Sequence, residues 1–155
     1  MPTLDKAIVK KYIEEVIAEL LDNQTARRFQ HTREWAKRAP ASAGVYTIFE
    51  DNVLIYVGET GCIQKRMMDD LLNTRHHSLR RSLGADLFRH ETDYQPATTR
   101  NNFPPRIEEL LKNYMEEHLS VNTMVVPFGR LEIEETIIGQ EPIPKYNKKS
   151  KRSED

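Results

Sequence analysis

Residues 44–61 read GVYTIFEDNVLIYVGETG, and this stretch decides the fold. It is rich in β-branched and aromatic residues on both sides of a short polar break, a composition typical of strands. The break contains Asp51-Asn52, two residues that favour tight turns. The stretch therefore predicts a β-hairpin.

The length of the turn decides which side chains share a face. A turn of residues 51–52 alone would pair Tyr46 with Val57 and leave Tyr56 on the opposite face. A three-residue loop, residues 50–52, would pair Tyr46 with Tyr56 directly. We expect the three-residue loop, because Asn52 tolerates the left-handed conformation that such a loop needs at its end.

Apolar residues at helical spacing surround the hairpin. Residues 4–22 predict an amphipathic helix, with Val9, Ile13, Val16 and Leu20 on one face. Residues 92–105 contain three Pro and no periodicity, which indicates a long loop. Residues 120–128 predict a third strand. Further helices are expected from Ile63 to Leu72, from Ser78 toward Phe88, from Pro104-Pro105 to about His118, and from Arg130 to Ile138.

This order of elements predicts an α+β fold: a small three-stranded, antiparallel-type sheet flanked by helices, with an added N-terminal amphipathic helix. We expect an N-terminal helical extension over residues 1–42, a functional domain over residues 43–148, and a basic, flexible tail over residues 149–155.

Composition narrows the class of protein. The chain has 155 residues, which suits one domain, and its net charge is −1. No run of 18 apolar residues exists, and the N-terminus lacks a secretory pattern, so we expect a cytoplasmic protein with no membrane contact. The single cysteine, Cys62, cannot form an internal disulfide. Residues 61–90 carry six Lys and Arg against three Asp, as an anion-binding face would.

Five sequence elements together carry a specific signal. Gly44-Val45-Tyr46 and Tyr56-Val57-Gly58 lie ten residues apart, and Arg66 follows after ten more. Glu135 then precedes residues 144–147, Pro-Lys-Tyr-Asn. In this order the elements resemble the GIY-YIG endonuclease family, and the resemblance covers roughly residues 43–148.

The residue types also suit phosphodiester hydrolysis on chemical grounds. That reaction needs an activated water and neutralisation of charge on the phosphorus and the leaving oxygen. An Arg fork contacts two phosphate oxygens and stays charged at any working pH. One Mg²⁺ held by a single carboxylate and several waters supplies charge neutralisation. A Tyr phenol, with an unperturbed pKa of about 10, needs an adjacent cation before it can act as a base.

The resemblance implies a role for each element. Tyr46 would position or deprotonate the water, and Tyr56 would support it. Arg66 would hold the scissile phosphate, and Glu135 would bind one Mg²⁺ or Mn²⁺ ion. Asn147 would anchor the edge of the site.

Each assignment has a plainer alternative. A strand tyrosine taken singly is more often structural, and Arg66 lies one turn before Asp70, so an exposed ion pair explains it equally. Glu134 competes with Glu135, because it falls on the helical wheel between Ile137 and Ile138. Only the family's spacing of twelve residues before Asn147 selects Glu135.

Further candidates lie outside the five elements. His76 and His77 could act as a proton shuttle or a metal ligand, but adjacent histidines more often lie at the surface or cap a helix. Three basic residues are candidate nucleic-acid contacts beside Asn147, with a solvated basic surface as the alternative: Arg80, Arg81 and Lys145.

Two positions depart from the family pattern. Glu59 stands where many members carry Lys, and Asp70 where some carry Tyr or His. The leading hypothesis is a metal-dependent endonuclease acting on nucleic acid, with DNA expected and RNA left open. The alternative is a catalytically impaired module that binds nucleic acid or a protein. The N-terminal helix is the candidate surface for a homodimer or partner protein.

Overall fold

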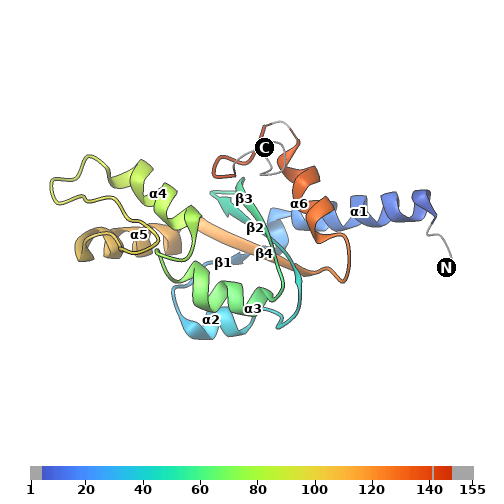
Figure 1. Ribbon diagram of the computed structural model, residues 1–155, viewed down its shortest axis with the longest axis horizontal. Helices are drawn as coiled ribbons and strands as arrows, with labels where there is room; N and C mark the ends of the chain where they lie inside the picture. Colours follow the sequence, from blue (N-terminus) through green and yellow to red (C-terminus); the bar gives the residue numbers. More distant parts are fainter. Residues whose placement is uncertain (1–4, 141, 148–155) are drawn as a thin grey trace.

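The α+β prediction is confirmed by a computed structural model of the protein, which describes residues 5–140 and 142–147 (Figure 1). Its sheet has four antiparallel strands in the order β1-β4-β2-β3. The three longer strands are those expected from the sequence: β2 (Gly44–Glu50), β3 (Val53–Thr60) and β4 (Leu119–Val125). The fourth, β1 (Arg27–Arg28), was not predicted, because two residues are too few to show a period.

The predicted helices are present in the predicted order, but one differs in type and two short elements are additional. The helix expected over residues 63–72 is α-helical only at its start and continues as a π-helix, and two short elements before the hairpin were not predicted. The predicted tail over residues 149–155 lies outside the described residues. The helical elements are α1 (Lys6–Leu20), η1 (Asn23–Thr25), α2 (Arg33–Lys37), α3 (Ile63–Lys65), the π-helix η2 (Arg66–Leu71), α4 (Ser78–Phe88), α5 (Pro105–His118) and α6 (Arg130–Ile138).

The hairpin turn corrects the predicted loop length. Glu50 pairs with Val53, so the turn contains only Asp51 and Asn52, whose φ angles are 47° and 70°. Positive φ at both central residues is the geometry that matches the twist of two antiparallel strands, and Asp and Asn tolerate it. The three-residue loop was therefore wrong.

A β-bulge nevertheless places the two tyrosines on one face. Phe49 pairs with Leu54, but Ile48 pairs with Tyr56, so Ile55 is the extra residue of β3. The bulge shifts the register by one, and Tyr46 then lies opposite Gly58. Since Tyr56 and Gly58 are two residues apart, both face the side of the sheet that Tyr46 faces.

The sheet separates two apolar clusters. Tyr46 and Ile48 of β2 face the larger cluster, to which α2, α3, η2, α4 and α5 contribute. Val45 and Val57 face the smaller cluster with α1 and α6. The alternation follows from the two-residue period of a strand, because successive side chains point to opposite faces. Within the described residues, no helix is long and apolar enough to cross a membrane.

Candidate active site

Four side chains that are distant in sequence meet on one face of the β2–β3 hairpin: Tyr46, Tyr56, Arg66 and His77, called here the Tyr46 cluster. The ring centroids of Tyr46 and Tyr56 are 5.9 Å apart, and those of Tyr56 and His77 are 5.1 Å apart. The Nε of Arg66 donates a hydrogen bond to Tyr46 Oη at 3.2 Å. Tyr46 is fully buried, so its phenol is held in one position.

Two glycines make room for this arrangement. A Cβ at Gly58 would lie 2.5 Å from Cζ and 2.6 Å from Oη of Tyr46, so only glycine lets the phenol cross β3 at this point. A Cβ at Gly44 would lie 2.1 Å from the carbonyl oxygen of Met124 on the neighbouring strand β4. Sequence reasoning used both glycines as motif markers and missed that Gly58 positions Tyr46.

His77 presents a defined tautomer to Tyr46. Its Nδ1 accepts a hydrogen bond from the backbone N–H of Leu79 at 3.2 Å, which caps α4, and its Nε2 lies 2.9 Å from Tyr46 Oη. Burial, followed by the positive charges of Arg66, Arg80 and Arg81, lowers the pKa of His77 to about 3. A neutral imidazole whose Nδ1 accepts must carry its proton on Nε2. His77 therefore donates to Tyr46 Oη.

Tyr46 Oη thus accepts hydrogen bonds from two donors, His77 Nε2 and Arg66 Nε. Both bonds stabilise a phenolate relative to a phenol. Burial acts in the opposite direction and raises the pKa of Tyr46 well above its ordinary value, and the nearby Tyr56 adds to the rise while Arg66 opposes it. In this structure Tyr46 is a neutral phenol at pH 7.

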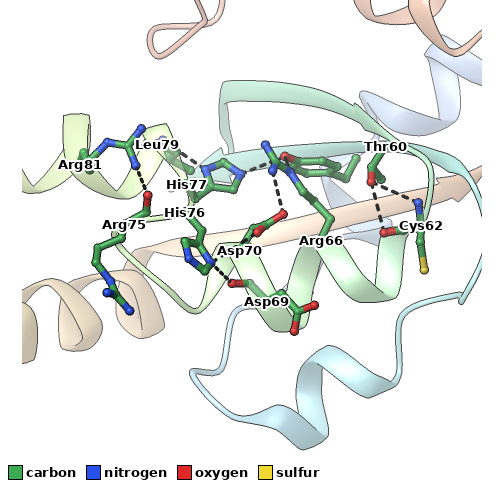
Figure 2. Close-up of polar contacts among 11 residues, drawn as sticks. Thr60, Cys62, Arg66, Asp69, Asp70, Arg75, His76, His77, Leu79 and Arg81 are labelled. Carbon is green, nitrogen blue, oxygen red and sulfur yellow. Dashed lines mark hydrogen bonds and ion pairs between the residues drawn. The ribbon is translucent and has the colours of Figure 1, made fainter. Parts of the chain in front are cut away.

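Arg66 is held by two partners at the start of the π-helix η2. Its Nη1 donates to the Asp70 carboxylate at 2.8 Å, so the ion pair weighed from the sequence is present together with the bond to Tyr46. Figure 2 shows the Arg66 side chain reaching from its helix toward His77, with Asp70 close to its guanidinium. Burial alone would lower the pKa of Arg66, but Tyr46 and Asp70 raise it, so the guanidinium stays charged. π-Helical turns are frequent at functional sites.

Glu134 on α6 is a half-buried carboxylate beside β3. It accepts a hydrogen bond from the backbone N–H of Glu59 at 2.7 Å, at the outer edge of β3. Burial raises the pKa of Glu134, and repulsion from Glu59 and Glu135 adds to this, whereas the Glu59 N–H and the positive charge of Arg66 lower it. Glu135 is the adjacent residue and is also half-buried. Both carboxylates are therefore candidates for the site, and Glu134 is the one with a hydrogen bond to Glu59 N–H.

Residues 144–147 run along the outer edge of β3. The side chain of Asn147 accepts from Val57 N–H and donates to Val57 C=O, both at 2.8 Å, and Tyr146 N–H donates to the carbonyl of the bulged Ile55 at 2.9 Å. These contacts satisfy an edge that would otherwise expose unpaired backbone groups. Asn147 is therefore placed at the edge of the hairpin, with its side-chain amide occupied by backbone.

The other basic candidates lie outside the Tyr46 cluster. Arg80 is 2% exposed and is hydrogen-bonded to Thr74, Leu71 and Glu108. Arg81 donates to the carbonyl of Thr74 and, as Figure 2 shows, to that of Arg75, which fixes the loop before α4. Arg80 is therefore unavailable to a nucleic-acid phosphate in this structure. Arg81 already donates hydrogen bonds to two backbone carbonyls.

His76 and Lys145 are both exposed. The Nδ1 of His76 lies 2.9 Å from the carbonyl oxygen of Asp69 and 3.7 Å from the Asp70 carboxylate. The Nζ of Lys145 lies 4.0 Å from the carboxylate of Asp86. Of the two adjacent histidines, only His77 contacts the Tyr46 cluster.

Glu59, one of the departures from the family pattern, has its own cation. Its carboxylate lies 3.5 Å from Arg130 Nε, and Arg130 also donates to the Thr60 carbonyl at 2.9 Å. The negative charge at this position is thus balanced within the protein.

Comparison with known proteins decides the family. A family model described as the GIY-YIG catalytic domain matches residues 23–150, most of the chain. This chain belongs to the GIY-YIG family. No curated protein and no solved structure matches it. Membership of the GIY-YIG family implies nuclease activity in general and suggests an endonuclease that binds nucleic acid.

Proposed function

We propose that this GIY-YIG protein is a metal-dependent endonuclease that hydrolyses DNA phosphodiester bonds at the Tyr46 cluster. The observation that carries the proposal is the position of Tyr46 Oη, which accepts from Arg66 Nε and His77 Nε2 while Tyr56 lies beside it. Two nitrogen donors on one phenol oxygen stabilise its phenolate form, which is the form that can act as a general base.

The donor set fits a single divalent ion bound through one carboxylate. Among residues 5–140 and 142–147, no group of three or more His, Cys, Asp or Glu side chains is arranged to hold a metal. Mg²⁺ does not require such a group, because it keeps several waters and binds through one or two carboxylates and substrate phosphates. Glu134, half-buried and subject to the positive charge of Arg66, is the carboxylate we assign to it, with its half-buried neighbour Glu135, which the family spacing selects, as the alternative. When bound, the ion would neutralise charge on the phosphate and the leaving oxygen.

We assign phosphate binding, proton transfer and positioning to the residues of the Tyr46 cluster. Arg66 uses Nε for Tyr46 and Nη1 for Asp70, and we assign its Nη2 to the scissile phosphate. Tyr46 first releases its phenolic proton to solvent, and the phenolate then takes a proton from the attacking water as the water oxygen bonds to phosphorus and the bond from phosphorus to the leaving oxygen breaks. His77 and Arg66 hold that phenolate, and Tyr56 limits how far the Tyr46 ring can move.

A binding module without chemistry is the second candidate, and Asp70 favours it. Asp70 occupies one nitrogen of Arg66 and opposes a negatively charged phosphate beside it. The two candidates differ in one observable. An enzyme converts supercoiled plasmid to nicked and linear forms, whereas a binding module only retards DNA in a gel.

The proposal is tested by plasmid cleavage with Mg²⁺ or Mn²⁺, with and without a chelator. We expect cleavage that stops with chelator and falls by about 100-fold or more in Glu134→Gln. Glu135→Gln is the matched control, since it makes the same change one residue along the helix, and it should stay within a few-fold of wild type. Equal losses in both variants, or cleavage that persists with chelator, would contradict the assignment of Glu134.

A further inference from the structure

Helix α1 carries its charges in an order that is unfavourable for an isolated helix. Its N-terminal half contains Lys6, Lys10 and Lys11, and its C-terminal half contains Glu14, Glu15 and Glu19. The first turn has no acidic residue and the last turn no basic one. This order opposes the helix dipole, which favours acids at the N-terminus and bases at the C-terminus.

The ion pairs within α1 repeat the same order. Lys10–Glu14 and Lys11–Glu15 are i,i+4 pairs at 3.9 Å with Lys nearer the N-terminus, the weaker of the two orientations. The charge pattern therefore adds little to the helix itself. It does match a second helix of the same sequence running in the opposite direction, since basic and acidic halves then face each other.

One face of α1 also borders an apolar groove of about 770 Å³ between α1 and α6. Val9, Ile13 and Ile17 line it from α1, with Lys10 and Glu14 on the same face. The described residues leave Val9 and Ile13 only half-buried. In Figure 1 the N-terminal half of α1 extends beyond the rest of the molecule, so a second helix can approach this face.

Apolar side chains outside the lining of the groove are also exposed. Phe128 is 50% exposed and stacks on Tyr12 of α1 with ring centroids 4.5 Å apart, and Leu131 at the start of α6 is 38% exposed. Ile8 of α1 is 64% exposed.

We propose that the groove between α1 and α6 is a homodimer interface in which the α1 helices of two copies pack antiparallel. With the two Ile13 side chains at the two-fold axis, Val9 of each copy lies opposite Ile17 of the other. At 1.5 Å per residue, Lys10 of one copy then lies about 3 Å along the axis from Glu14 of the other, within reach of a flexible lysine. The interface brings the basic half of each α1 helix against the acidic half of the other, and it also places the two Glu14 residues about 3 Å apart along the axis. It does not depend on the proposed nuclease activity.

Charge reversal on the full-length protein tests the antiparallel arrangement. We expect wild type to approach twice its chain mass of 18.1 kDa in sedimentation equilibrium between about 1 and about 100 μM. Lys10→Glu and Glu14→Lys each replace two attractive contacts per dimer with repulsive ones and should weaken the dimer dissociation constant about ten-fold. The double variant Lys10→Glu/Glu14→Lys exchanges the charges and should restore dimerisation.

Lys11→Glu is the matched control. It breaks an identical ion pair on the same helix, with Glu15, but Lys11 does not line the groove, so the dimer should be unaffected. A monomer at about 100 μM, or no recovery in the double variant, would overturn the proposal. Loss of DNA binding without a change in mass in Lys10→Glu would instead show that this groove takes nucleic acid.

Discussion

His77→Asn should remove a large part of the acid sensitivity of the fold. Asn keeps the cap of α4, because its side-chain oxygen can accept the Leu79 N–H that His77 Nδ1 accepts in the wild type. It removes the buried imidazole, whose pKa burial and three arginines lower to about 3. Below pH 6.5 the unfolded chain binds a proton at this imidazole that the folded protein excludes, so stability falls as the pH falls from 6.5 toward 3.

The size of the effect follows from the two pKa values. With 6.5 for the unfolded chain and about 3 for the folded protein, His77 alone lowers the free energy of unfolding by about 2 kcal/mol between pH 7 and pH 5. Carboxyl groups with ordinary pKa values contribute little in this interval. Urea unfolding of both proteins at pH 7 and pH 5 measures the change, and the other four histidines are common to both, so subtraction removes them.

We expect the wild type to lose about 2 kcal/mol more than His77→Asn on this acidification. His77→Asn also loses the contact with Tyr46, which lowers its stability at every pH, so the comparison uses the change with pH and not the absolute value. Equal losses in the two proteins would show that His77 is not a buried neutral donor, and the tautomer argument would fail with it.

Four further predictions address single contacts. The rate of plasmid cleavage should rise about tenfold per pH unit from pH 7 to 9, because the raised pKa of Tyr46 leaves the phenolate a minor species throughout; a flat profile would contradict proton abstraction by Tyr46. Gly58→Ala should lower cleavage by about 100-fold by displacing the Tyr46 ring, and wild-type cleavage would refute the packing argument. Arg80→Ala should lower the free energy of unfolding by about 3 kcal/mol, because Glu108 loses its buried partner; a drop only in DNA affinity would reverse this interpretation. Lys145→Ala should reduce the salt dependence of DNA binding by about one in logarithmic slope, and an unchanged slope would place Lys145 outside the interface.

Patterns within the hairpin predicted its existence but not its register. Asp51 and Asn52 identify the turn, yet the bulge at Ile55 has no local signature, since its carbonyl is used by Tyr146 far along the chain. The sequence predicted both phenols on one face of the sheet, but from the wrong turn length; the bulge at Ile55 is what places them there.

Burial of charged residues was equally hard to predict. Arg80 and Arg81 look alike in sequence, but Arg80 is buried and pairs with Glu108 on α5, whereas Arg81 donates to the backbone of the loop before α4. Glu134 likewise has its hydrogen-bond partner on another element, the Glu59 N–H on β3. Motif spacing selects candidate residues, while their tertiary partners come from segments distant in the sequence.

Tyr46→Phe tests the assignment of the active site most directly. It removes only the oxygen that Arg66 and His77 contact, and Tyr114→Phe is the matched control, since it removes a phenol oxygen hydrogen-bonded to Glu50 outside the cluster. Single-turnover cleavage of plasmid with Mg²⁺ should fall by at least about 100-fold in Tyr46→Phe and stay near the wild-type rate in Tyr114→Phe. Wild-type cleavage by a folded Tyr46→Phe would mean that the chemistry takes place elsewhere.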